Sequence, residues 1–297
     1  MLYPTKNTIV FHDGSFVKGE KLGVNPFSQT LHYGYGVFDA LRAYDTALGP
    51  HIFKAREHYE RFIQSAENLQ LKVPYTTDEL INITYQLLEK NSMTNAYIRP
   101  MLYLGTNMEL VPAEKKHLLI AVWKWGKYMG KDLLDVKVSS VQKPKPKNFL
   151  VEAKICGQYL YSMVANNEAR KEGYDAALML DYEGYVAEGP GSNFFYENEG
   201  KLYTPPRGSI LPGITRQTII NLAAELGVEV EERLFTPEEL ANVDAAFFTG
   251  TASQITGLKS IDGKPFKKKW EDTIGSALLI KYGHKVTQSE YDGYSII

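Results

Sequence analysis

The chain has 297 residues, and its 33 lysines and arginines nearly balance 35 aspartates and glutamates, giving a net charge of −2. Hydrophobic residues make up 44% of the chain, which suits a globular protein of one large domain or two ordinary ones. The near-neutral balance argues against nucleic acid or an anionic membrane as the main partner. The lysine runs at 143–147 and 267–269 are expected to be solvated loops.

The cysteine and histidine content narrows the class further. A single cysteine, Cys156, excludes a disulfide framework and a cysteine-based zinc site. The six histidines are scattered without an HExxH motif, so we expect no metal. The first residues contain no basic segment followed by a long apolar one, and no apolar run reaches the roughly 18 residues of a membrane span. These features predict a cytoplasmic protein with no membrane partner.

The first part of the chain is predicted to form a compact α+β unit. Short strands are predicted at 8–11 and 15–17, joined by the hairpin-forming step Asp13-Gly14. A glycine-punctuated, aromatic stretch at 31–44 leads into a further strand. A helix is predicted at 54–70, where apolar side chains recur at helical spacing. A second helix is predicted at 77–91, where residues 76–79 form an N-terminal cap. Strands are predicted at 97–104 and 118–125.

The second part also mixes strands and helices. Helices are predicted at 159–173, at 215–226 and from 237 onward, with strands at 176–180 and 245–249. Because the strands do not alternate regularly with crossover helices, a doubly wound parallel sheet is disfavoured. We therefore expect an α+β (mixed α/β) protein with domains at 1–125 and 136–297, joined by an interdomain connection at 126–135.

Three glycine-containing segments are candidate phosphate sites, although neither the Rossmann nor the Walker spacing occurs. They lie at 188–193, 211–216 and 249–254. The second opens a predicted helix, and the N–H groups of Ile214 and Thr215 at its positive dipole end suit a phosphate. Each loop alone is more typical of a plain turn, whereas the three together favour a bound phosphate.

Lys154 differs from the other lysines because small and apolar residues flank it just before a predicted helix. Desolvation lowers the pKa of a lysine and makes its amine a better nucleophile, as Schiff-base chemistry requires. Its local context alone favours a lysine that reaches solvent from a helix start. A catalytic role also needs the phosphate cradle and an acid beside the cofactor.

Further segments join these motifs in a fixed order along the chain: 33–34, 37–38, 56–58, 97–100, 154–159, 188–193, 211–216 and 250–252. This order resembles that of the fold-type IV (class IV) pyridoxal-phosphate aminotransferases, and most closely the branched-chain amino acid aminotransferases. An ordered set of this kind is far more specific than any one motif. The resemblance implies that family's architecture, with the cofactor between a smaller N-terminal domain and a larger C-terminal domain that carries the lysine.

The resemblance implies a role for each residue around the cofactor pyridoxal phosphate. Lys154 would hold it as an internal aldimine and then act as the base that moves the substrate proton. Glu188 would pair with the pyridine nitrogen, and Tyr159 would hydrogen-bond the phenolic oxygen. The phosphate would be held by Arg56, Ile214, Thr215 and Thr251.

The resemblance also implies how substrates bind. The α-carboxylate would meet the backbone amides of Thr251 and Ala252 and the side chain of Tyr97. Arg99 and Tyr33 would meet the distal carboxylate of glutamate. The alternative for Arg99 is a strand arginine paired at the surface. The implied substrate-binding residues are Tyr33, Phe38, Tyr97, Arg99, Thr251 and Ala252.

The implied activity is ping-pong transfer of an amino group between branched-chain L-amino acids (leucine, isoleucine or valine) and 2-oxoglutarate, by a homodimer or larger homo-oligomer. The chain departs from the family pattern at Asp39-Ala40, usually Glu-Gly, and at Ile155-Cys156, usually Ala-Gly. Alternatives on the same scaffold are a D-amino acid aminotransferase, an R-selective amine transaminase and aminodeoxychorismate lyase. A non-catalytic phosphate-binding protein is the alternative of a different class.

Overall fold

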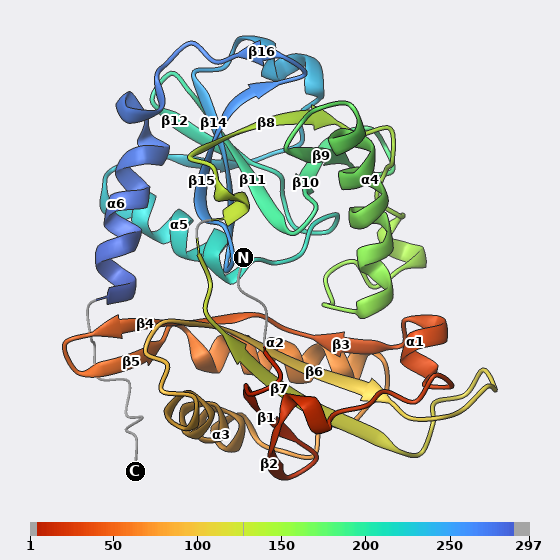
Figure 1. The fold of residues 1–297 in the computed structure, drawn as a ribbon. Coiled ribbons are helices and arrows are strands. Elements are labelled where there is room, and N and C mark those ends of the chain that lie inside the picture. Colours follow the sequence, from red (N-terminus) through yellow and green to blue (C-terminus); the bar gives the residue numbers. More distant parts are fainter. Residues whose placement is uncertain (1–4, 127, 288–297) are drawn as a thin grey trace. The chain divides into compact units, whose positions relative to one another are not determined.

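The computed structural model describes residues 5–126 and 128–287, and its elements are drawn in Figure 1. Backbone contacts divide the chain into two compact units. The first contains the residues up to Gly126, the short segment Ala153–Gln158 and the end of the last helix. The second contains residues 128–152 and the stretch Tyr159–Lys285.

The first unit is built on a seven-stranded antiparallel sheet with the strand order β2-β1-β7-β6-β4-β5, in which β3 also pairs with β6. Its strands are β1 (Ile9–His12), β2 (Ser15–Lys18), β3 (Gly36–Phe38), β4 (Leu41–Thr46), β5 (Gly49–Ile52), β6 (Ala96–Leu104) and β7 (Lys116–Trp123). Its helices are α1 (Gln29–Tyr33), α2 (Ala55–Asn68) and α3 (Thr77–Lys90), with a 3-10 turn η1 (Gly19–Lys21).

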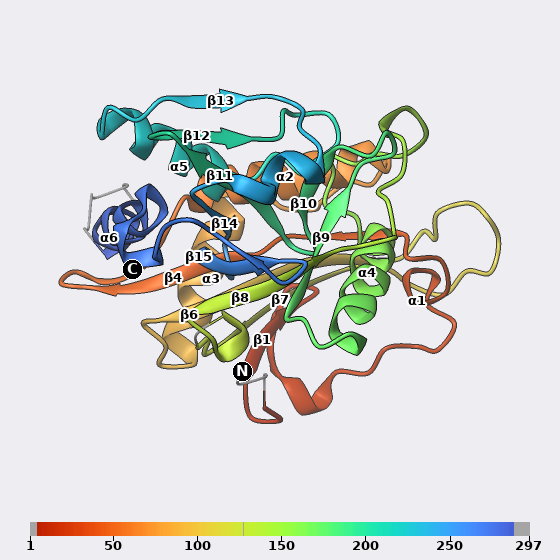
Figure 2. The ribbon, with the colours of Figure 1, turned by 90° about the horizontal axis from the view of Figure 1, so that it is seen from above.

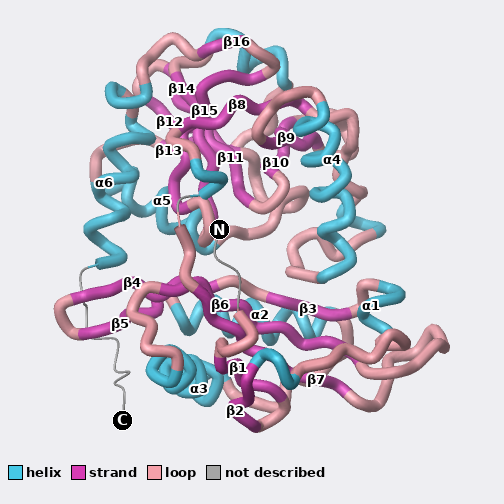
Figure 3. The backbone as a smooth tube through the Cα atoms, viewed as in Figure 1, coloured by secondary structure: helices cyan, strands magenta, loops and turns pink. Residues whose placement is uncertain are grey.

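One face of this sheet is covered by α2 and α3, which Figure 3 shows as helices beside the strands of the first unit. Tyr59 and Phe62 of α2 pack with Leu80 of α3 and with alternate residues of β6 and β7 in one buried core. Side chains alternate along a strand, so the neighbouring residues of β6 point to the opposite, half-buried face. That opposite face carries Tyr97 and Arg99, which are described below as part of the candidate site.

Residues 153–158, which include Lys154, pack with the first unit. Ile155 forms a β-bridge with Val37, and the Gly157 N–H donates to Gly34 O at 3.0 Å. A Cβ added at Gly34 would lie 2.6 Å from the Gly157 Cα, so glycine is required where these two segments cross. The domains predicted from the sequence place Lys154 in the C-terminal domain, residues 136–297. Backbone contacts group its segment, Ala153–Gln158, with the first unit. The division into domains at 1–125 and 136–297 remains a prediction.

The second unit contains a nine-stranded mixed sheet with the order β10-β9-β8-β15-β14-β11-β12-β13, in which β16 pairs with β15. An additional pairing between β10 and β11 closes the strands from β10 to β11 into a barrel. Its strands are β8 (Leu133–Val138), β9 (Ala176–Leu180), β10 (Val186–Gly189), β11 (Ser192–Asn198), β12 (Lys201–Thr204), β13 (Val230–Glu232), β14 (Ala245–Gly250), β15 (Gln254–Ile261) and β16 (Lys264–Pro265).

The helices of the second unit lie around this barrel. Helix α4 packs against β8 and β9 (Figure 2). Helix α5 contacts β13 and β14. The helices are α4 (Tyr159–Lys171), α5 (Ile214–Glu225) and α6 (Ile274–Thr287), whose last residues belong to the first unit. The 3-10 turns are η2 (Tyr128–Gly130), η3 (Pro146–Asn148), η4 (Cys156–Gln158) of the lysine segment, η5 (Pro237–Asn242) and η6 (Trp270–Asp272).

The mixed α/β class expected from the sequence is confirmed. Among the described strands, parallel pairs occur only within the mixed sheet, where β8 pairs with β9 and β15, and β12 with β13. The helix predicted from residue 237 is a 3-10 turn opened by a Thr236–Glu239 capping box. Across residues 5–126 and 128–287, no helix combines the length and apolar character that crossing a bilayer requires.

Candidate active site

Lys154 has the environment of a reactive amine. The residue is 8% exposed, its backbone N–H donates to Ser65 Oγ at 3.0 Å, and its Nζ lies 5.0 Å from the centre of the Phe38 ring. Burial and the nearby positive charge of Arg61 lower the pKa of Lys154 to about 8. At pH 7 about a tenth of this amine is therefore unprotonated, far more than for an ordinary lysine, and the unprotonated form is the one that a nucleophile or base requires.

A buried ionic group lies on the side of this lysine nearest α2. The carboxylate of Asp39 is fully buried and accepts from Arg61 Nε at 2.9 Å and Arg61 Nη2 at 2.8 Å. His58 Nδ1 lies 2.9 Å from Asp39 Oδ1. Burial alone would raise the pKa of Asp39, but Arg61 and His58 outweigh it and hold that pKa far below its usual range. Asp39 is therefore a fixed anion that orients Arg61.

Arg99 and Tyr97 stand on the half-buried face of β6, two positions apart. Arg99 Nη2 donates to the Tyr97 hydroxyl at 2.9 Å, and the Arg99 guanidinium lies 4.6 Å from the Phe38 ring centre. The Tyr97 ring stacks on Trp125, with ring centres 4.5 Å apart. Arg99 Nε is buried and has no hydrogen-bond partner among the described residues. Phe38, Tyr97, Arg99 and Lys154 thus form one cluster that suits an anionic ligand with an apolar part.

Arg56 and Tyr33 lie apart from this cluster. Arg56 is half exposed and pairs with Asp78 at 2.6 Å and with Glu60 at 3.9 Å. Tyr33 is 46% exposed, and its hydroxyl donates to Met108 O at 3.2 Å. Arg56 and Arg61 are five positions apart in α2, so their side chains point in directions about 140° apart around the helix axis. Arg56 therefore faces solvent, and Arg61 faces the buried ionic group of Asp39 and His58.

Arg61 is therefore the arginine of α2 whose charge acts on Lys154, and the sequence motifs did not identify it as a candidate. Its signal in the sequence is the i,i+3 spacing from His58, on the face of the helix that carries the buried Phe62 and Ser65. Helical periodicity could have distinguished this arginine from Arg56.

In the second unit, Glu188 is anchored at the end of β10. It forms an ion pair with Lys143 and accepts from Asn193 Nδ2 at 3.1 Å. The backbone N–H of Leu211 donates to its carboxylate at 3.2 Å. The expectation of a solvated lysine run is therefore wrong at Lys143, because its side chain is 11% exposed and paired with this carboxylate. The Glu188 side chain is 14% exposed and remains reachable by a ligand.

The start of α5 is tied to the same cluster. Asn193 faces Glu188 across β10 and β11, and its Nδ2 donates to Leu211 O at 2.9 Å, two residues before the N-cap of α5. The first N–H groups of the helix, at Ile214 and Thr215, have no acceptor within it. Arg216, the next residue, is turned inward and bonds Pro205 O at 2.9 Å and Glu232 at 2.6 Å, so it serves the fold.

Three buried hydroxyls of the second unit have no hydrogen-bond partner among the described residues: those of Ser192, Thr249 and Ser253. Thr249 faces Asn193 across β11 and β14, and Ser253 Oγ lies 3.0 Å from the place of a Cβ on Gly250. Buried hydroxyls without partners are costly, so this cluster suits a polar ligand. Thr251 and Ala252 lie in the turn between β14 and β15, and Tyr159 is the first residue of α4.

The fold and its two clusters together fit one class of protein, the enzymes that combine a nucleophilic lysine with a cradle for an anionic cofactor. Residues 36–261 match the family model of amino-transferase class IV. The chain belongs to the class IV aminotransferase family.

The similar proteins described below are all branched-chain amino acid aminotransferases. The chain is 40% identical over 265 residues to a branched-chain-amino-acid aminotransferase of Pseudomonas aeruginosa, covering 87% of this chain and 86% of the relative. The crystal structure of the Escherichia coli branched-chain amino acid aminotransferase superposes with a TM-score of 0.91 at 35% identity, covering 97% and 98% of the two chains. A second solved branched-chain amino acid aminotransferase, complexed with N-(5'-phosphopyridoxyl)-L-glutamate, gives the same TM-score, identity and coverage.

Proposed function

We propose that this chain is a pyridoxal-phosphate-dependent transaminase that moves amino groups between branched-chain L-amino acids and 2-oxoglutarate. The observation that carries the proposal is the buried Lys154 amine, whose pKa is lowered to about 8, in a class IV chain. The second solved relative holds an adduct that joins a pyridoxyl phosphate to L-glutamate, which supports both the cofactor and the second substrate.

The residues of both units fit pyridoxal phosphate, which carries an aldehyde, a phosphate and a ring nitrogen. Lys154 would bind the aldehyde carbon, Glu188 the ring nitrogen, and Tyr159 the phenolic oxygen. The three buried hydroxyls without partners in the described part of the second unit match a group rich in acceptor oxygens. The phosphate would be held by the N–H groups of Ile214 and Thr215, by Thr251, and by Arg61 in place of Arg56.

When bound, the cofactor withdraws electrons and so makes the Cα proton of the substrate acidic. Lys154 Nζ then accepts that proton, and a pKa of about 8 suits a base that works near neutral pH. Asn193 and the Leu211 N–H hold Glu188 in one orientation, and the ring nitrogen would replace Lys143 as the partner of the other carboxylate oxygen. Arg99, whose guanidinium donates to the Tyr97 hydroxyl, would bind the distal carboxylate of glutamate, and Phe38 would contact the apolar side chain of leucine.

The visible spectrum of the purified holoenzyme tests this function. We expect addition of L-leucine or L-glutamate to remove the absorbance band of the bound cofactor, and 2-oxoglutarate to restore it. A response to D-alanine instead would assign the D-amino acid alternative, and pyruvate release from aminodeoxychorismate would assign the lyase. A protein that shows no band after incubation with pyridoxal phosphate would refute the proposed enzymatic function.

Arg99→Ala should separate the two substrates. Loss of a charged hydrogen-bonding partner of a carboxylate costs about 1.5–3 kcal/mol, so KM for glutamate should rise roughly 10- to 100-fold. Leucine has no distal carboxylate, and its KM should change much less. Steady-state kinetics of both half-reactions measure the difference. Equal losses for leucine and glutamate would give Arg99 a structural role.

The further expectations about the whole protein are also part of the proposal. Self-association as a homodimer or larger homo-oligomer is supported by exposed apolar residues in the β6–β7 connection, where Leu110 is 89% and Val111 55% exposed. A cytoplasmic location rests on the single cysteine. Small amino acids and 2-oxo acids are the expected partners.

A further inference from the structure

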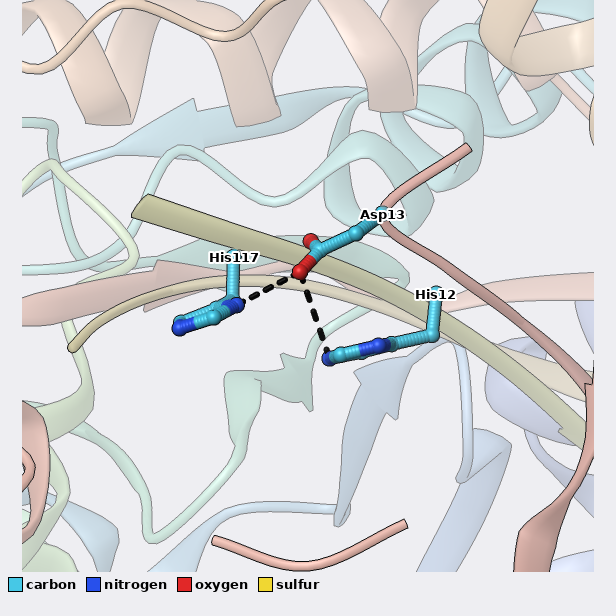
Figure 4. A group of neighbouring side chains, drawn as sticks. All are labelled: His12, Asp13 and His117. Carbon is cyan, nitrogen blue, oxygen red and sulfur yellow. Dashed lines mark hydrogen bonds and ion pairs between the residues drawn. The ribbon is translucent and has the colours of Figure 1, made fainter. Parts of the chain in front are cut away.

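Two histidines and an aspartate of the first unit lie together where β1 pairs with β7. His12 ends β1, Asp13 lies in the β1–β2 turn, and His117 is the second residue of β7 (Figure 4). His117 Nδ1 lies 2.6 Å from Asp13 Oδ2, and His12 Nε2 lies 3.8 Å from the same oxygen. The three ligand atoms all lie within 4.8 Å of one another.

Strand pairing creates this group from residues far apart in the sequence. Strand β1 runs antiparallel to β7, with His12 opposite Leu119. Asp13 has a φ of 48° and enters the hairpin turn, where its N–H donates to Leu118 O at 3.0 Å. The Leu118 N–H returns a hydrogen bond to Asp13 Oδ1 at 2.9 Å. Linear spacing therefore could not reveal the group, and the expectation of no metal did not consider it.

The donor set is that of a transition-metal site. Two imidazole nitrogens and one carboxylate oxygen are common ligands of zinc, and leave a position for water. Such a metal binds its ligands at about 2.0–2.2 Å, which needs only small side-chain shifts from the present separations. Asp13 Oδ1 is already held by the backbone of β7, so Oδ2 is the oxygen left facing both rings.

The surroundings keep these ligands partly buried and oriented. The side chains of His12, Asp13 and His117 are 22%, 35% and 15% exposed. The Tyr103 hydroxyl lies 2.8 Å from His12 Nε2, and its ring stacks on His117 at 4.8 Å between centres.

We propose that His12, Asp13 and His117 bind one divalent transition-metal cation of the zinc class. The ion would join the β1–β2 turn to β7 across 104 residues of chain (117 − 13 = 104) and so stabilise the first unit against unfolding. This site is separate from the proposed cofactor residues, and its ligands take no part in the reaction proposed above.

Isothermal titration of the chelator-treated holoenzyme with ZnCl₂ tests the proposal. We expect one zinc per chain, and a dissociation constant that rises by roughly 10- to 100-fold or more in His117→Gln and Asp13→Asn. His51→Gln is the matched control, because His51 is a partly exposed histidine of β5 in the same unit, and it should bind zinc like the wild type. No zinc binding by the wild type would overturn the proposal and leave Asp13 and His117 as a plain hydrogen-bonded pair.

Thermal unfolding provides a second readout, in which each variant is compared with itself in the presence and absence of zinc. Zinc should raise the Tm of the wild type and of His51→Gln, and at the same concentration should raise the Tm of His117→Gln much less. The absorbance band of the cofactor should not change during the titration. An equal zinc effect in His117→Gln, or a change of the cofactor band that parallels zinc binding, would place the ion elsewhere and refute the site.

Discussion

Replacing Lys154 with alanine should abolish the visible band of bound cofactor and reduce turnover by at least about 1,000-fold, since both a nucleophile and a general base are lost. The Lys154→Arg variant should be equally inactive, because a guanidinium keeps the charge but supplies no unprotonated amine. Absorbance spectra and single-turnover rates with L-leucine measure both effects. An exposed lysine, Lys201, pairs with Glu229 at 2.7 Å and gives the matched control Lys201→Ala, which should be fully active. A band that persists in Lys154→Ala would contradict the assignment.

The pH dependence of cofactor capture supplies an independent readout of the same amine. Below its pKa of about 8, Lys154 is protonated and cannot attack an aldehyde. The rate at which apoprotein acquires pyridoxal phosphate should therefore rise about tenfold per pH unit up to that value and level off above it. A rate that continues to rise to the pKa range of an ordinary lysine would show that burial and Arg61 do not act on Lys154 as described.

Much of the fold could be predicted because local signals are strong where helices and hairpins begin. The helix predicted at 77–91 is α3 at Thr77–Lys90, opened by the capping box of Thr76 and Glu79. The hairpin predicted at Asp13-Gly14 joins β1 to β2. The barrel closure between β10 and β11 and the position of the 153–158 segment could not be predicted, since both depend on contacts between distant parts of the chain.

The candidate site was only partly accessible from sequence for the same reason. Motif order pointed to Lys154 and Glu188, and the structure gives each a fixed, partly or fully buried environment. A motif marks a neighbourhood and does not specify which side chain of a helix faces the ligand. Arg56 belongs to the motif, yet the turn of α2 places it beside Asp78 at the surface. The motifs also gave no sign that Asp39 is the anion that holds the neighbouring arginine of α2.

The two arginines of α2 therefore make a matched pair of substitutions. Arg61→Ala should raise the dissociation constant for pyridoxal phosphate by roughly 10- to 100-fold, the cost of losing a charged donor to a phosphate. Arg56→Ala should leave that constant unchanged, because its side chain is half exposed and paired with Asp78. Titration of the visible band measures both. Loss of affinity in Arg56→Ala and none in Arg61→Ala would restore Arg56 as the phosphate ligand.

Arg61→Ala also leaves the carboxylate of Asp39 buried without its guanidinium, which should cost about 3–5 kcal/mol of unfolding free energy. The double variant Arg61→Ala with Asp39→Asn separates this effect from cofactor binding. It removes the unpaired charge while an amide oxygen still accepts from His58, so urea unfolding should recover most of the lost stability. Affinity for pyridoxal phosphate should stay low, because no cation has been returned. Recovery of affinity together with stability would instead make Arg61 a structural residue whose only task is to neutralise Asp39.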